Sequence, residues 1–377
     1  MARQAYPLPR DLHPAAWWAW ALGLAVAASR TTNPWLLLTI VAVAGYVVVA
    51  RRSDAPWALS FRLYLWLGAL IVITRVVFRI VFGGAEGSTV LFTLPEIPLP
   101  EVAAGIRLLG AVSAESVLAG LYDGLRLATM VVCLGAANAL ANPKRLLRSM
   151  PSALYEVGAA VVVALSFFPQ LSESLVRVRR ARRLRGDVGK GVRAPRSLVI
   201  PVLEDALDRS LQLAASMDSR GYGRAGGLDR RTRATTGTLL VAGLVGMCVG
   251  VYATLDTLTP RYLAAPMLVV GLVLAGTGFV IAGRRVQRTR YRPDHWHAAE
   301  VAVAACGLAV ASVLVAVGEG ASAATLVPAV VSATWPPLTW APLLGVLIGT
   351  LPAWVSPPPR PTHVSADADR MPAGAIA

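Results

Sequence analysis

Apolar runs long enough to cross a lipid bilayer dominate the sequence. About 20 apolar residues span the hydrocarbon core as a helix, and eight runs approach or exceed that length. They are Ala15–Ser29, Trp35–Ala50, Trp57–Phe82, Ser113–Ala141, Thr235–Ala253, Tyr262–Gly283, Ala298–Val317 and Ala324–Leu351. We therefore expect an all-α integral membrane protein with about eight transmembrane helices. Trp335-Pro336-Pro337 predicts a kink or break in the last one.

Basic residues in the loops predict the orientation of these helices. The chain is 55% hydrophobic and only 15% charged, yet its formal net charge is +15. Basic clusters follow residues 50, 142 and 283, whereas the connection from Gly83 to Gly105 carries only acidic charges. Because basic loops stay in the cytoplasm, we expect a multi-pass protein of the cell membrane with both termini cytoplasmic. The same rule accounts for the positive charge without a nucleic-acid partner.

One apolar run does not fit as a span. Ala153–Leu171 has basic residues on both sides, so a crossing would place one basic block outside the cell. We expect Ala153–Arg185 to form one long helix, or two helices bent near Pro169, along the cytoplasmic side of the membrane. Together with the spans, this predicts an N-terminal membrane region over residues 1–141, a cytoplasmic module over 142–234, further membrane helices over 235–351 and a disordered tail over 352–377.

The cytoplasmic module carries much of the positive charge and contains two helix signals. Residues 177–233 hold 15 Lys and Arg against 6 acidic residues. The first helix stops at Gly186, and a second begins after Pro201 and closes at Gly221. Both helices end in an arginine followed by glycine, at Leu184-Arg185-Gly186 and Ser219-Arg220-Gly221. Each arginine is therefore expected at an exposed helix tip.

At these residues the sequence resembles the transmembrane T component of energy-coupling-factor (ECF) transporters, the CbiQ/EcfT family. "MDSRGYGR" is the most specific motif, and "LHPAAWWAW", "NPWLLL" and "ANALANPKRLLRSMPSALYEVGAAVVVALSFFPQLSESL" are also similar to the family. The resemblance covers roughly the first 255 residues. In that family two cytoplasmic coupling helices end in short arginine motifs, often Ala-Arg-Gly, and this chain has Leu184 and Ser219 where alanine is frequent.

The resemblance implies a non-catalytic permease subunit that links ATP hydrolysis in partner subunits to uptake of a vitamin or of cobalt or nickel ions. Its implied partners are two ABC-type ATPase subunits and a substrate-binding S component. Carried over by position, the ATPase-coupling residues are Leu184, Arg185, Gly186, Ser219, Arg220 and Gly221. The substrate stays open, because recognition in this family belongs to the S component.

Other functional classes find less support in the residues. "GDVGKGVR" lacks the spacing of a phosphate-binding loop and follows a helix, so the ATPase must be a partner. Cys133, Cys248 and Cys306 lie far apart in apolar runs, and His295 and His297 flank an interfacial tryptophan. We expect no catalytic residue, cofactor or metal site. A self-contained secondary transporter is the alternative, although the sequence has no evident internal repeat.

Charged residues inside the third and fourth spans need partners within the membrane. Arg75 and Arg79 lie four residues apart on one face of a helix, and Glu115, Asp123 and Arg126 follow in the next span. Gly120-x-x-x-Gly124 would permit close helix approach. We expect ion pairs or snorkelling of the arginines, with a role in packing.

Overall fold

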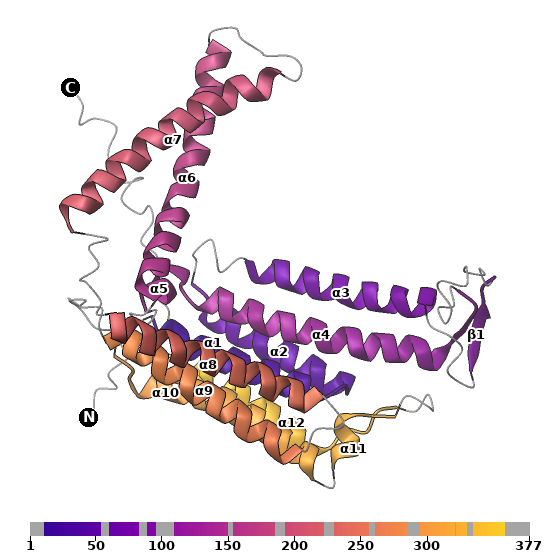
Figure 1. Ribbon diagram of the computed structural model, residues 1–377. Helices are drawn as coiled ribbons and strands as arrows, with labels where there is room; N and C mark the ends of the chain where they lie inside the picture. The colour runs from indigo at the N-terminus through magenta and orange to yellow at the C-terminus, as the bar shows by residue number, and fades with distance from the viewer. Residues whose placement is uncertain are drawn as a thin grey trace, which may run out of the picture. The chain divides into compact units, whose positions relative to one another are not determined.

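The computed structural model describes residues 11–53, 60–82, 89–95, 109–149, 154–184, 193–221, 230–255, 261–284, 295–320, 322–329 and 335–358. Two compact units divide the chain, one formed by residues 1–146 with 293–377 and the other by residues 147–292. This division differs from the predicted domains, because the helices after residue 293 join the N-terminal unit. Figure 1 gives the order of the elements.

The core of the first unit is a bundle of helices from both ends of the chain. Helix α1 (Pro14–Ser29) packs against α4 (Ala114–Leu140) and α10 (Ala298–Glu319). Helix α2 (Pro34–Arg51) packs against α4 and the short α12 (Trp340–Leu347). Trp20, Leu24 and Ile40 are among the largest side chains in the buried core.

Asn33 ties the turn between α1 and α2 to the C-terminal segment. Its side chain accepts a hydrogen bond from the Trp35 amide, which caps α2, and Pro34 occupies the first turn of the helix. Its Nδ2 donates to the carbonyls of Thr325 and Pro337 at 3.0 and 2.8 Å. The buried Thr31 hydroxyl donates to the Leu326 carbonyl. Hydrogen bonds to the C-terminal segment thus hold the turn between α1 and α2, in addition to the cap of α2 itself.

Close packing of two glycines joins α1 to α10. A Cβ atom on Gly23 would overlap the backbone carbonyl of Gly307 and lie 2.9 Å from its Cα atom. The Trp20 indole Nε1 donates a hydrogen bond of 3.1 Å to the Gly349 carbonyl. Because small residues let helix backbones approach closely in membrane proteins, this contact fixes α10 on α1.

The last predicted span is broken, as its prolines indicate. Helix α11 (Ala323–Leu326) ends well before α12, and residues 335–339 are not helical. A short 3-10 helix, η4 (Ile348–Thr350), and α13 (Pro352–Val355) follow. The predicted tail therefore begins too early, since Pro352 and Ala353 are buried and the Ala353 carbonyl accepts a hydrogen bond from Arg51. Residues 359–377 lie outside the described residues.

Helix α3 (Phe61–Phe82) lies along α4, and two short strands cap this pair at one end (Figure 1). Strands β1 (Val90–Thr93) and β2 (Ala111–Ser113) pair antiparallel. The sequence does not predict these strands, which lie in and just after the connection between the third and fourth spans. Apart from them, the regular secondary structure of the described chain is helical.

The second unit contains the helices α6 (Tyr155–Leu184), α7 (Arg193–Ser219), α8 (Arg230–Leu255) and α9 (Arg261–Arg284). The six-residue helix α5 (Pro143–Arg148) precedes them. Helices α8 and α9 pack together closely, because a Cβ atom on Gly246 would lie 3.1 Å from the Cα atom of Gly271. Small residues again set the distance between two apolar helices.

Among the described residues, seven helices are long and apolar enough to cross a membrane: α2, α3, α4, α6, α8, α9 and α10. Six of them coincide with predicted spans, so the chain is an all-α, multi-pass membrane protein. Helix α1 has 16 residues and is shorter than the usual span of about 20. The length and composition of α6 would also allow a crossing. Its placement along the cytoplasmic side stays a prediction from the basic flanks.

Candidate functional site

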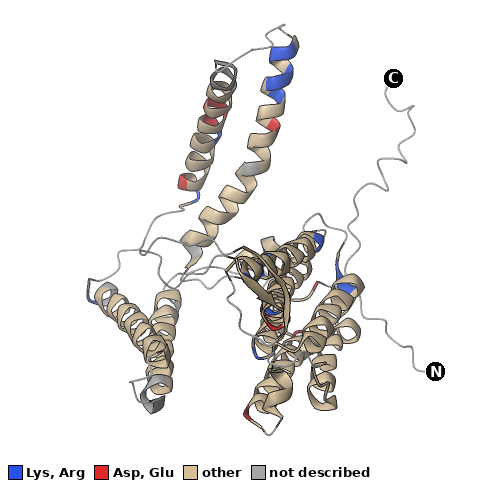
Figure 2. Cartoon of the chain, turned by 90° about the vertical axis from the view of Figure 1, so that its right-hand side faces the viewer, with Lys and Arg blue, Asp and Glu red and all other residues tan. Residues whose placement is uncertain are grey.

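Helix α6 changes from an apolar to a basic helix along its length. It is continuous over 30 residues with Pro169 inside it, as the sequence predicts. Proline removes one hydrogen bond from the helix, and the rest of the ladder continues on both sides. Figure 2 shows Lys and Arg gathered at its C-terminal end, where Arg182 and Arg183 occupy the last turn. Positive side chains at this end also stabilise the helix, because they interact with the partial negative charge of its C-terminus.

Helix α7 begins earlier than the sequence predicts. It starts at Arg193, so that Pro201 lies inside the helix and does not mark its start. Its C-terminus agrees with the prediction, because α7 ends at Ser219 and Gly221 adopts a φ of +74°. The amides of Arg220 and Gly221 donate to the carbonyls of Met217 and Asp218. Glycine suits this left-handed turn, which stops the helix directly after Arg220.

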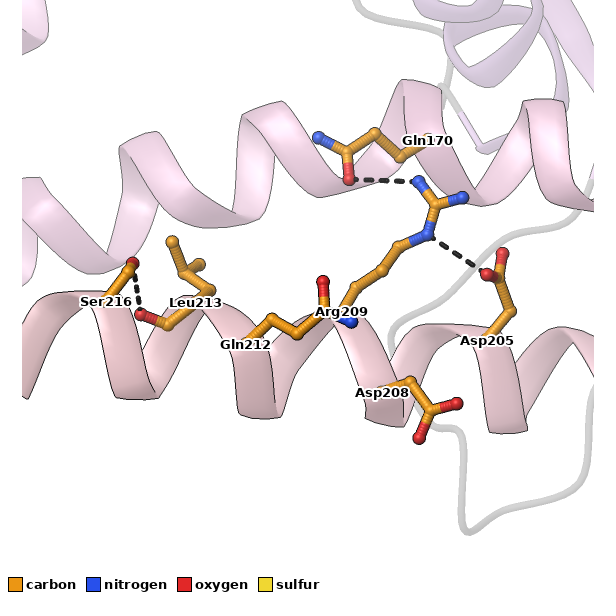
Figure 3. Close-up of a pocket in the computed structure, with 7 residues that line it drawn as sticks. All are labelled: Gln170, Asp205, Asp208, Arg209, Gln212, Leu213 and Ser216. Atoms are coloured by element: carbon orange, nitrogen blue, oxygen red, sulfur yellow. Dashed lines mark hydrogen bonds and ion pairs between the residues drawn. The ribbon is translucent and has the colours of Figure 1, made fainter.

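Asp205 is the centre of the polar contact between α6 and α7. Its carboxylate accepts hydrogen bonds at 3.1 Å from Arg177 of α6 and from Arg209 of α7. The hydroxyl of Ser174, a buried residue of α6, also hydrogen-bonds to this carboxylate. Figure 3 shows Arg209 between Asp205 and Gln170, with its Nη1 3.5 Å from the Gln170 Oε1 atom. We name these five residues the Asp205 clamp.

The clamp favours the ionised form of Asp205. The hydrogen bonds from Ser174 and Arg209, and then the charges of Arg209 and Arg177, lower the pKa of Asp205 below its ordinary value of 3.8. A carboxylate with a lowered pKa stabilises the folded state above its ordinary pKa, and this contribution is lost as the pH falls through the lowered value. The clamp should therefore persist at neutral and mildly acidic pH and loosen only below pH 3.8.

Replacing Asp205 with asparagine should loosen α6 from α7. The change removes the charge that pairs with both arginines, so we expect faster hydrogen–deuterium exchange in α6 and α7 around the clamp. Asp208→Asn is the matched control, because Asp208 lies on the same helix but points away from α6 (Figure 3). Equal exchange in the two variants would show that apolar packing alone holds the helices.

The described residues at the two predicted helix tips are exposed. Leu184 is 89% exposed at the end of α6, and Ser219 and Arg220 are exposed at the end of α7. Among the residues that the structure describes, no carboxylate pairs with Arg220. Arg185 and Gly186 lie outside the described residues. Because α7 runs back along α6, the two C-terminal ends lie at opposite ends of the pair (Figure 1).

Sequence reasoning missed the clamp, although its pattern is present. Gln170, Ser174 and Arg177 are spaced four and three residues apart and therefore share one face of α6. Asp205 and Arg209 are spaced four residues apart in α7. Within the described chain, no group of three or more His, Cys, Asp or Glu is arranged to hold a metal ion. The arrangement is that of two antiparallel helices joined by polar contacts, with an exposed arginine at one end.

A comparison with known families places most of the chain in one family. The family model described as CbiQ, cobalt transport protein, matches residues 8–232, which is more than half of the chain. The match includes helices α1 to α4 and the α6–α7 pair, whereas α9 to α13 lie beyond it. A search of curated proteins finds no match.

Proposed function

The chain belongs to the CbiQ cobalt transport protein family, and we propose that it is the transmembrane coupling subunit, or T component, of an energy-coupling-factor importer. As a member of this family it is a membrane component of a transport system. In this role it would transmit the movement of two ABC-type ATPase subunits to a substrate-binding S component. The cargo would be cobalt, nickel or a vitamin, and the chain itself would be non-catalytic.

The exposed tip of α7 is the observation that carries this proposal. Arg220 follows the last helical turn, and Gly221 turns the chain away directly after it. An arginine there presents five donors on a long side chain, so it can enter a groove on a partner and bind carboxylates or backbone carbonyls. Arg185 is proposed to do the same after α6, with Leu184, Gly186, Ser219 and Gly221 shaping the two tips.

The α6–α7 pair supports a mechanism for coupling. Its two C-terminal ends face opposite directions, so one ATPase subunit could bind at each end (Figure 1). The Asp205 clamp joins the helices between these ends. When ATP closes the ATPase pair, the anchored tips would move and α6 would shift with them, beneath the S component. Such motion of rigid helices is a known means of coupling distant sites.

Co-purification tests this proposal most simply. The full chain should be expressed with its neighbouring genes and isolated through a C-terminal tag on this chain alone. We expect two ATPase subunits and one S component to be recovered with it. Recovery of the chain alone, with substrate uptake that needs an ion gradient and no ATP, would contradict the proposal and support a secondary transporter.

A further inference from the structure

A small cavity opens where α3 and α4 approach the two strands. It has a volume of about 410 Å³, and its lining consists of Arg75, Phe78, Arg79, Phe82, Gly120 and Asp123. Helix α3 buries only Phe61 and Gly68 in the described structure, so most of its apolar side chains are exposed at the surface of the first unit. The cavity therefore places two arginines on an exposed face of a helix that is long and apolar enough to cross a membrane.

The charges in this cavity are incompletely balanced. Arg79 Nη2 lies 3.8 Å from the Asp123 carboxylate, which is longer than the about 2.8 Å of a charge-assisted hydrogen bond. Within the described residues, Arg75 has no ion pair. Among the described residues that line the cavity, two guanidinium groups and one carboxylate leave one positive charge in excess. Because an unpaired arginine is costly at membrane depth, the cavity favours an additional anion.

The side chains of Arg75 and Arg79 pack against two glycines of α4. A Cβ atom on Gly120 would lie 2.7 Å from Arg79 Cγ, and one on Gly124 would lie 3.1 Å from Arg75 Cβ. The aliphatic parts of both arginines thus lie directly on the α4 backbone. Phe78 and Phe82 stack at 5.4 Å between ring centroids and supply an apolar wall.

We propose that this cavity binds the phosphodiester headgroup of a glycerophospholipid. Arg75 and Arg79 donate to the phosphate oxygens, and the two phenylalanines contact the first carbons of an acyl chain. Arg75 lies seven residues before the end of α3, about 10 Å along the helix axis. Its long side chain can reach the headgroup layer by snorkelling. The apolar wall favours a lipid over free phosphate, which has no apolar part.

Native mass spectrometry of the full chain in detergent tests this site. The probes are dioleoyl phosphatidylglycerol, dioleoylglycerol with the same acyl chains but no phosphate, and inorganic phosphate. We expect the intact chain to bind the phospholipid at least about tenfold more tightly than dioleoylglycerol. The variant Arg75→Gln/Arg79→Gln should lose this preference, and Arg75→Lys/Arg79→Lys should keep some of it. Arg62→Gln is the matched control on the same helix, outside the cavity.

Three results would overturn the proposal. Equal binding of phosphatidylglycerol and dioleoylglycerol by the intact chain would exclude phosphate recognition, and this comparison needs no variant. Competition by inorganic phosphate at equal concentration would indicate a site for a free anion. An unchanged preference for phosphatidylglycerol in the Arg75→Gln/Arg79→Gln variant would show that these two arginines do not bind the phosphate.

Discussion

Arg220→Ala is expected to weaken binding of an ATPase subunit by roughly 2–5 kcal/mol. The physical reason is that the arginine would be buried and hydrogen-bonded in the partner's groove, so its loss leaves partner acceptors without donors. The α7 helix should stay folded, because the turn at Gly221 and the amide hydrogen bonds that end the helix do not use the arginine side chain. Pull-down of the ATPase subunits measures the loss of affinity.

Arg179→Ala is the matched control for this experiment. Arg179 is an exposed arginine of α6 that lies before the tip. A solvated surface charge contributes little to binding, about 0–1 kcal/mol. Equal and small losses for Arg179→Ala and Arg220→Ala would mean that the basic residues of this unit serve only to orient the chain in the membrane.

Gly307→Ala should destabilise the first unit strongly. Its new Cβ atom would overlap the backbone of Trp20, which cannot move without separating α10 from α1. Overpacking of a core typically lowers the free energy of unfolding by about 1–3 kcal/mol. Because the clash here is between two backbones, we expect a loss near the upper end of that range. We expect a lower midpoint of thermal unfolding for the purified protein.

Gly45→Ala separates this clash from the general effect of replacing a helical glycine. Gly45 lies within α2, and a Cβ atom there would meet no atom within 4 Å. Alanine favours a helix over glycine by about 1 kcal/mol, so this variant should be as stable as the original chain or slightly more stable. An equal loss of stability in both variants would contradict the close contact between α1 and α10.

The helices were largely predictable because hydropathy and helix-terminating residues are local signals. Gly221, for example, predicts the end of α7. The predicted start of α7 after Pro201 is wrong, because α7 begins at Arg193. Proline removes one hydrogen bond but does not always interrupt a helix. The broken last span was predictable from Trp335-Pro336-Pro337, where two consecutive prolines remove neighbouring hydrogen bonds.

Contacts between distant segments were not predictable from one sequence. The packing of Gly23 on Gly307 joins residues that the predicted domains assign to separate regions of the chain. The Asp205 clamp likewise depends on which faces of α6 and α7 meet, and helical periodicity does not specify this. The Arg79–Asp123 ion pair was one of several pairings that the sequence left open, beside snorkelling of the arginines, because the sequence does not specify which charged residues of the two spans meet.

ATP-driven uptake by the reconstituted complex tests the coupling role most directly. The measurement compares the original chain, the double variant Arg185→Ala/Arg220→Ala and the matched double variant Arg179→Ala/Arg180→Ala in the same proteoliposomes. We expect the tip variant to lose uptake while its membrane helices stay folded, and the matched variant to keep most of it. Full ATP-driven uptake by the Arg185→Ala/Arg220→Ala variant would contradict coupling through these two arginines.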